Sequence, residues 1–145
     1  MGRKIPGFIA GLVAGVLTVA IIESVSSFLY PVPENFDPTN LDHMKAFIDS
    51  LPAPAYIIDL FAHFLGGLTA GFVARLIVKE PWTIGTVQLG ALFTCAGIAN
   101  LIVIPHPIWF AMIDISVYLP AAYLGARLAA TFLCSSATLA SSKPE

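Results

Sequence analysis

Residues 54–78 of the chain have the sequence PAYIIDLFAHFLGGLTAGFVARLIV, and this stretch decides the fold class. A run of about 20 mostly apolar residues is long enough to cross a bilayer as a helix. Asp59 and His63 interrupt the run one helical turn apart, so they share a helix face. The stretch therefore predicts a transmembrane helix that carries two ionisable groups on one side.

Three further apolar runs of similar length cover residues 5–30, 82–104 and 107–134. Hydrophobic residues make up 57% of the chain and charged residues 11%, whereas a soluble domain usually has about 25% charged residues. The fold class is therefore predicted to be an all-α integral membrane protein, a four-transmembrane-helix bundle. The runs use most of the 145 residues. We expect a single domain over 1–145, with a tail at 135–145 and no appended catalytic domain.

Charge predicts the orientation and excludes one class of partner. With four spans, one side of the membrane receives Arg3, Lys4, Arg75, Lys79, Arg127 and Lys143, while Lys45 alone falls on the other. The positive-inside rule places the first side, with both termini, in the cytoplasm. The net charge of −2 offers no basic patch for nucleic acid. The lipid bilayer is the expected environment.

The connection between the first two runs carries a second helical pattern. Asp37-Pro38 is typical of a helix start, with Asp37 as the cap. Apolar residues then recur at helical spacing at Leu41, Met44, Ile48 and Leu51. We expect a short amphipathic helix on the periplasmic surface, positioned to cover the mouth of the bundle.

Polar residues inside the four runs fall at about the same depth. Counting 1.5 Å per residue from the outer helix ends, each helix has a polar group about 8–10 Å into the hydrocarbon. The group comprises Glu23, Asp59, His63, Asn100 and Asp114, with His63 one turn deeper than Asp59. An ionisable residue inside a membrane is a functional-site hypothesis by default. These five residues are the predicted site, a polar pocket that faces the periplasm.

Small residues occupy the same helix faces further from this pocket. Gly7, Gly11 and Gly15 recur every four residues in the first run, and Gly66/Gly67 continues the face of His63 in the second. Small-xxx-small faces let helices approach closely in lipid. We therefore expect a bundle that is tight in its cytoplasmic half and wider around the acids.

Three functions are compatible with the acid cluster. The first is binding or transport of a cation, a proton or a small polar solute, because close carboxylates repel unless a proton or cation neutralises them. Glu23, Asp59, His63 and Asp114 are suitable metal ligands, but no motif fixes a metal or another cofactor. The second is structural, with the acids fixing helix register and His63 paired with Asp59. The third is an accessory subunit whose acids pair with a partner and whose glycine-rich first helix docks. Conduction would favour a homo-oligomer.

One enzymatic reading is weaker. Gly97-Ile98-Ala99-Asn100-Leu101-Ile102, followed by Asp114, resembles the third-helix region of the lipoprotein signal peptidases, small four-helix membrane proteases with two aspartates. That family places an aspartate directly after Asn-Leu-Ile, where this chain has Val103, and an arginine where it has Ile104. The catalytic pair is therefore incomplete unless Asp59 replaces it from another helix. The sequence favours a protein that is not an enzyme.

A second resemblance covers nearly the whole chain. The chain resembles a group of small four-helix bacterial inner-membrane proteins of uncharacterised function. The motifs that carry this resemblance are Tyr30-Pro31, Asp37-Pro38-Thr39, Ser50-Leu51-Pro52, Gly66-Gly67, Ala74-Arg75, Ala99-Asn100-Leu101 and Pro105-His106-Pro107-x-Trp109. The resemblance implies the four-span topology and a bacterial inner-membrane location. It implies no activity.

Overall fold

The computed structural model describes residues 2–141, with side chains up to Ser135, and this part of the chain is helical. Its helices are α1 (Lys4–Leu29), α2 (Leu41–Ser50), α3 (Ala53–Val78), α4 (Thr83–Val103) and α5 (Ile108–Ser141). Four of them, all but α2, are long and apolar enough to cross a membrane. The all-α, four-span prediction is confirmed at this level, and the chain has the build of a multi-pass membrane protein.

The predicted helix ends are close to the observed ones except in α5. The candidate span in α5 ends at Ser135, yet the helix continues to Ser141. The tail predicted from residue 135 therefore starts inside a helix. The reason is that no glycine or proline follows Gly125 until Pro144, so the sequence supplies no stop signal there. Lys143, used in the orientation argument, lies outside the described residues.

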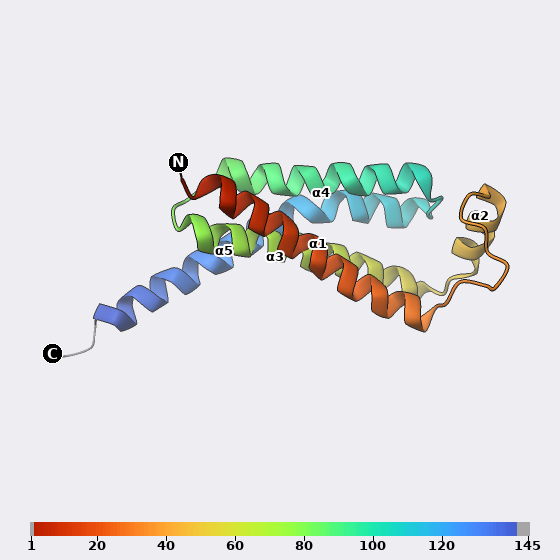
Figure 1. The fold of residues 1–145 in the computed structure, drawn as a ribbon, viewed down its shortest axis with the longest axis horizontal. Helices are drawn as coiled ribbons and strands as arrows, with labels where there is room; N and C mark the ends of the chain where they lie inside the picture. The colour runs from red at the N-terminus through yellow and green to blue at the C-terminus, as the bar shows by residue number, and fades with distance from the viewer. Residues whose placement is uncertain (1, 142–145) are drawn as a thin grey trace.

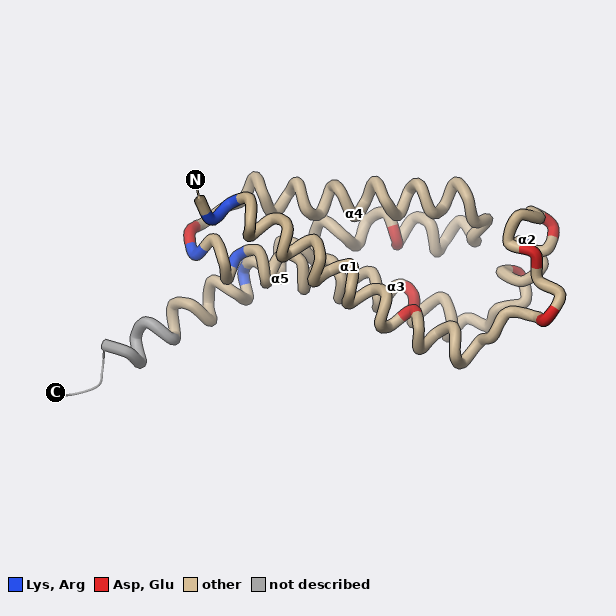
Figure 2. Tube along the Cα trace, viewed as in Figure 1, with Lys and Arg blue, Asp and Glu red and all other residues tan. Residues whose placement is uncertain are grey.

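The bundle is built around α3, as Figure 1 shows. α3 packs along α1 on one side and along α5 on the other, while α4 packs mainly on α5 and touches α1 and α3 only sparsely. The α1–α3 pair diverges from the α4–α5 pair toward the end where α2 lies (Figure 1). We call this the α2 end. The opposite one is the basic end, because the described Lys and Arg residues other than Lys45 gather there (Figure 2).

α2 begins later than predicted. Asn40 is its N-cap, and the Asn40 side chain accepts hydrogen bonds from the amides of Asp42 and His43. Asp37 instead closes the preceding turn, where its carboxylate accepts from the Thr39 hydroxyl at 2.7 Å and the Thr39 amide at 2.8 Å. These two bonds lower the pKa of Asp37. Asp37 is therefore not the helix cap, because its side chain already satisfies a turn.

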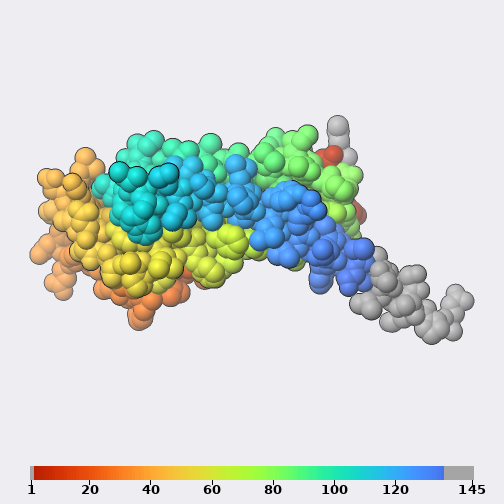
Figure 3. Space-filling view, turned by 180° about the vertical axis from the view of Figure 1, so that it is seen from behind, coloured from red at the N-terminus to blue at the C-terminus, as the bar shows by residue number. Residues whose placement is uncertain are grey.

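α2 packs on the end of the bundle where the two helix pairs diverge, as the space-filling view shows (Figure 3). Its Ile48 is buried against Tyr56 of α3 and Phe110 of α5. The Tyr56 hydroxyl donates a 2.5 Å hydrogen bond to the Ile48 carbonyl. The amphipathic helix predicted in this connection is therefore present, and a buried side chain anchors it to the bundle.

Close backbone contacts hold the rest of the bundle together. A Cβ built on Gly71 would lie 1.9 Å from the Ala122 carbonyl oxygen, and one built on Gly125 would lie 1.9 Å from that of Leu68. On the other side of α3, a Cβ on Gly11 would lie 2.6 Å from the Ala70 carbonyl oxygen. The glycine face of α1 is therefore used inside the bundle. It is not available for docking a partner, contrary to that part of the accessory-subunit reading.

Gly71→Ala should lower the stability of the bundle. The added methyl group would overlap the α5 backbone, and overpacking of this kind costs about 1–3 kcal/mol. Gly2→Ala is the control, because nothing lies within 4 Å of that position. Unfolding in a detergent titration measures both. Alanine favours a helix more than glycine does, so any loss of stability must come from the contact with α5. If Gly71→Ala were as stable as the wild type, the close α3–α5 contact would be wrong.

Candidate functional site

His63 of α3 joins two carboxylates from the neighbouring helices. Its Nδ1 lies 2.5 Å from Oδ1 of Asp114 on α5, and its Nε2 lies 3.3 Å from Oε1 of Glu23 on α1. The predicted pairing of His63 with Asp59 is wrong. Asp59 and His63 share a face of α3, but the imidazole reaches across to the helices on either side. These three residues, Glu23, His63 and Asp114, are called the triad below.

Burial increases along the triad. The side chain of Glu23 is 47% exposed, that of His63 is 9% exposed and that of Asp114 is 1% exposed. The second carboxylate oxygen of Asp114, Oδ2, is buried and has no hydrogen-bond partner among the described residues. The triad therefore leads from a partly exposed acid, which lines two cavities, to an enclosed one.

The hydrogen-bond pattern fixes the minimum number of protons in the triad. A neutral imidazole has one N–H, so it cannot donate to two carboxylates at once. Either the ring is protonated or one of the acids carries the proton and donates it to the ring. Both arrangements contain the same number of protons and leave a net charge of −1. The triad thus holds a proton whose position can shift between neighbouring atoms.

Aromatic rings lie next to the imidazole of the triad. The His63 ring lies 5.4 Å from that of Tyr118, which stacks on Phe93 at 6.1 Å. Gly97 of α4 makes room for this packing, because a Cβ there would lie 3.1 Å from the Tyr118 hydroxyl and 3.2 Å from Asp114 Oδ2. Tyr118 was not among the predicted site residues, although its position one helical turn after Asp114 was a signal for this role.

Two cavities with polar side chains on their walls meet at Glu23 and Asn100. The inner cavity has a volume of about 280 Å³, and His63, Phe93 and Tyr118 line it together with these two residues. The outer cavity, of about 510 Å³, extends to α2 and is lined by Asp59 in addition to the two. The five predicted site residues therefore do come together, with Asp114 enclosed behind His63 and the other four on cavity walls.

Asp59 occupies a separate position from the triad. Its carboxyl lies beside the Ser26 hydroxyl of α1 and within electrostatic range of Glu23. Neither Ser26 nor His106 was among the predicted site residues, yet both line the outer cavity. In the sequence, His106 was noted only within the Pro105-His106-Pro107 motif of the second resemblance. Its place between the third and fourth apolar runs was the one signal in the sequence that could have identified it.

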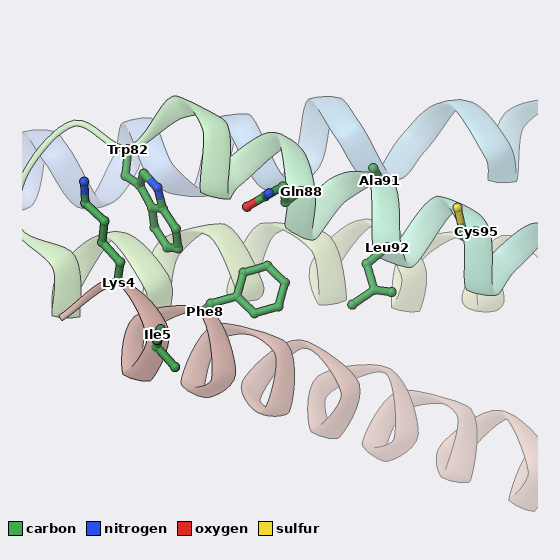
Figure 4. A pocket seen from close by; sticks show the side chains of 8 residues that line it. All are labelled: Lys4, Ile5, Phe8, Trp82, Gln88, Ala91, Leu92 and Cys95. Atoms are coloured by element: carbon green, nitrogen blue, oxygen red, sulfur yellow. The ribbon is translucent and has the colours of Figure 1, made fainter. Parts of the chain in front are cut away.

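A third cavity at the basic end has a different character. It has a volume of about 550 Å³ and lies between α1 and α4, where Phe8 and Leu92 point into the space between the helices (Figure 4). Lys4 and Gln88 are its polar side chains, and the rest of its lining is mainly apolar. It is as large as the outer cavity, but it has no acid on its wall among the described residues.

The donor arrangement does not favour a metal centre or an aspartate pair. No group of three His, Cys, Asp or Glu side chains within the described part of the chain is placed to hold one metal ion. Both nitrogens of His63 are already directed at carboxylates. Asp59 faces the outer cavity while Asp114 is enclosed behind His63, so the two aspartates are not presented together to a substrate.

Comparison with known protein families, curated proteins and solved structures finds no significant match. We therefore infer the function from the geometry of the triad and its cavities.

Replacing His63 should expose the dependence of Asp114 on its partner. His63→Leu leaves an enclosed carboxyl without its hydrogen bond, and we expect a loss of more than about 1 kcal/mol in unfolding free energy. The double variant His63→Leu/Asp114→Leu should regain part of that loss, because no orphaned acid remains. Detergent unfolding measures all variants, with His43→Ala as an exposed control. Strictly additive effects of the two substitutions would contradict the pairing.

Proposed function

We propose that this multi-pass membrane protein binds a small cation in exchange for a proton, in the cavities between the triad and α2. The observation that carries the proposal is the position of His63 between the carboxylates of Glu23 and Asp114. This arrangement holds a movable proton next to an open cavity. Chains of acids and histidines of this kind serve as proton relays in membrane proteins.

Charge selects a cation as the ligand. With its shared proton the triad has a net charge of −1, and Asp59 adds a second negative charge when ionised. No Lys or Arg is among the described residues that line the inner or outer cavity. Uncompensated negative charge in a low-dielectric site is costly. A small cation held by oxygens of Glu23, Asp59 and Asn100 would relieve that cost.

Binding is better supported than passage across the membrane. The inner cavity is bounded by Phe93, whose ring tip would lie 2.6 Å from a Cβ on Gly15 of α1. Leu12, which lies nearer the basic end of α1 than Gly15, packs against the cluster that Phe93 forms with Ala70 and Tyr118. Movement of a cation beyond this point would require Phe93 to change rotamer. Transport, and the homo-oligomer that conduction would favour, therefore remain extensions of the binding proposal.

The positive charge of the basic end indicates which side of the membrane the site faces. We place the basic end in the cytoplasm, because positively charged residues are retained on that side during insertion. The α2 end, with both polar cavities, then faces the periplasm of a bacterial inner membrane. A cation would enter from outside, past Phe47 and Ile48 of α2, which line the outer cavity.

Neutralising a cavity acid should abolish stabilisation by cations. Wild-type protein in detergent should unfold at higher temperature as Na⁺, K⁺ or Li⁺ replaces the bulky N-methylglucamine ion at constant ionic strength. At a hundredfold excess of the cation over its Kd, the unfolding free energy should rise by about 2.7 kcal/mol. Glu23→Gln and Asp59→Asn should remove this response. Glu34→Gln, which makes the same chemical change in an exposed loop, should retain it.

Other results of this experiment would decide against the proposal. A wild-type unfolding temperature that ignores all the cations would refute binding. If Glu23→Gln destabilised the protein but retained the stabilisation by cations, Glu23 would serve only helix register. An isolated bundle indifferent to both cations and substitutions would favour the accessory-subunit alternative.

Thiol labelling tests the orientation. In a variant with Cys95 and Cys134 replaced by alanine, Ala46→Cys in α2 should react with an impermeant reagent in intact cells. Gly2→Cys at the basic end should react only after the membrane is permeabilised, because that end is placed inside. Both sites are exposed, so a missing reaction reflects topology. Labelling of Gly2→Cys alone in intact cells would invert the proposed orientation.

A further inference from the structure

A small cavity at the basic end has two arginines on its wall. It has a volume of about 90 Å³ and lies where α3, α4 and α5 meet. Arg75 comes from α3, Arg127 from α5, and Thr83 and Thr86 from the first turn of α4. This cavity is at the opposite end of the bundle from the triad, so it is independent of the proposed cation site.

The two guanidinium groups are held in different ways. Nη1 of Arg75 is buried and has no hydrogen-bond partner among the described residues. Arg127 donates a 2.8 Å hydrogen bond from Nε to the Tyr123 hydroxyl, and its guanidinium lies 5.0 Å from the centre of the Tyr123 ring. Tyr123 thus fixes Arg127 beside the cavity, while Arg75 retains an unused donor. An unsatisfied buried donor on a charged group is costly and calls for an explanation.

Positive charge at this cavity is not balanced within the described part of the chain. Its lining contains no acid there, and Glu80, the nearby acid in the turn before α4, is paired with Lys4 of α1 at 3.4 Å. α4 begins at Thr83 without a side-chain cap, so the positive end of its dipole and its first free amides add to the charge of the arginines.

We propose that this cavity binds a phosphate group. Guanidinium groups recognise phosphate oxygens through paired hydrogen bonds, and a helix N-terminus favours the same anion. The volume admits one small group and not a large ligand. Trp82, a residue type typical of the membrane interface, also lines the cavity, which places it at headgroup depth. Basic pockets between transmembrane helices at this depth bind anionic lipid headgroups. Free inorganic phosphate has the same chemistry and is the other possible source.

Thermal unfolding and native mass spectrometry can test the site on the full-length protein in detergent micelles. The probes are phosphatidylglycerol, the zwitterionic phosphatidylcholine, and inorganic phosphate without lipid. The variants are Arg75→Gln, Arg127→Gln and, as a matched control, Arg3→Gln, which removes the same charge from an exposed position at the same end. Wild type and Arg3→Gln should retain bound phosphatidylglycerol and be stabilised by it. Arg75→Gln and Arg127→Gln should bind it about tenfold more weakly or worse, the loss expected for one charge-assisted hydrogen bond.

Each other outcome has a defined meaning. Arginine-dependent stabilisation by inorganic phosphate, without a further effect of phosphatidylglycerol, would support the site and identify free phosphate as its ligand. An equal loss in Arg3→Gln and Arg127→Gln would overturn the proposal, because attraction to the basic end as a whole would then explain the binding. Absence of any response to both anions would overturn it as well. If Arg75→Gln does not fold, the exposed Arg127 decides the test alone.

Discussion

The contact of His63 with carboxylates on both sides is the interaction on which the half of the bundle nearer the α2 end depends. α3 is the central helix, and His63 links it to α5 through Asp114 and to α1 through Glu23. Lipid offers no water to a polar group, so such groups must find partners inside the protein. The three helices are thereby held together at the depth where the bundle opens and where close backbone packing has ended.

Packing of small residues holds together the half of the bundle nearer the basic end. Gly71 and Gly125 bring α3 and α5 into backbone contact, and Gly11 does the same for α1 and α3. α4 takes little part in these contacts and approaches α1 only sparsely. The cavities along the α1–α4 side follow from this unequal packing. A bundle with four equally tight interfaces would enclose the same polar residues but leave no space for a ligand beside them.

Much of the fold could be predicted from the sequence because the bilayer requires a fixed length of apolar helix. Helical periodicity places residues on faces, so the glycine faces could also be predicted. The same holds for the common depth of the polar residues Glu23, Asp59, His63, Asn100 and Asp114. The pairing of His63 with Asp114 could not be predicted, because periodicity does not say which helices are neighbours. The same limit applies to Arg75 and Arg127, which indicated only orientation in the sequence and share a cavity in the structure. The cap of α2 was missed because both Asp37 and Asn40 are good capping residues, and the choice between them depends on the turn that Thr39 closes with Asp37.

The proposed exchange requires that the triad hold a proton that a cation can replace. Proton release from purified protein in weakly buffered detergent, followed with a pH indicator while Na⁺, K⁺ or Li⁺ is added, is a direct test of this exchange. We expect release of about one proton for each cation bound, because ligand sites that must lose a proton couple binding to its release. His63→Leu should bind without that release or fail to bind. Cation binding by the wild type with no proton released would contradict the exchange, and the triad would then be a structural link between helices.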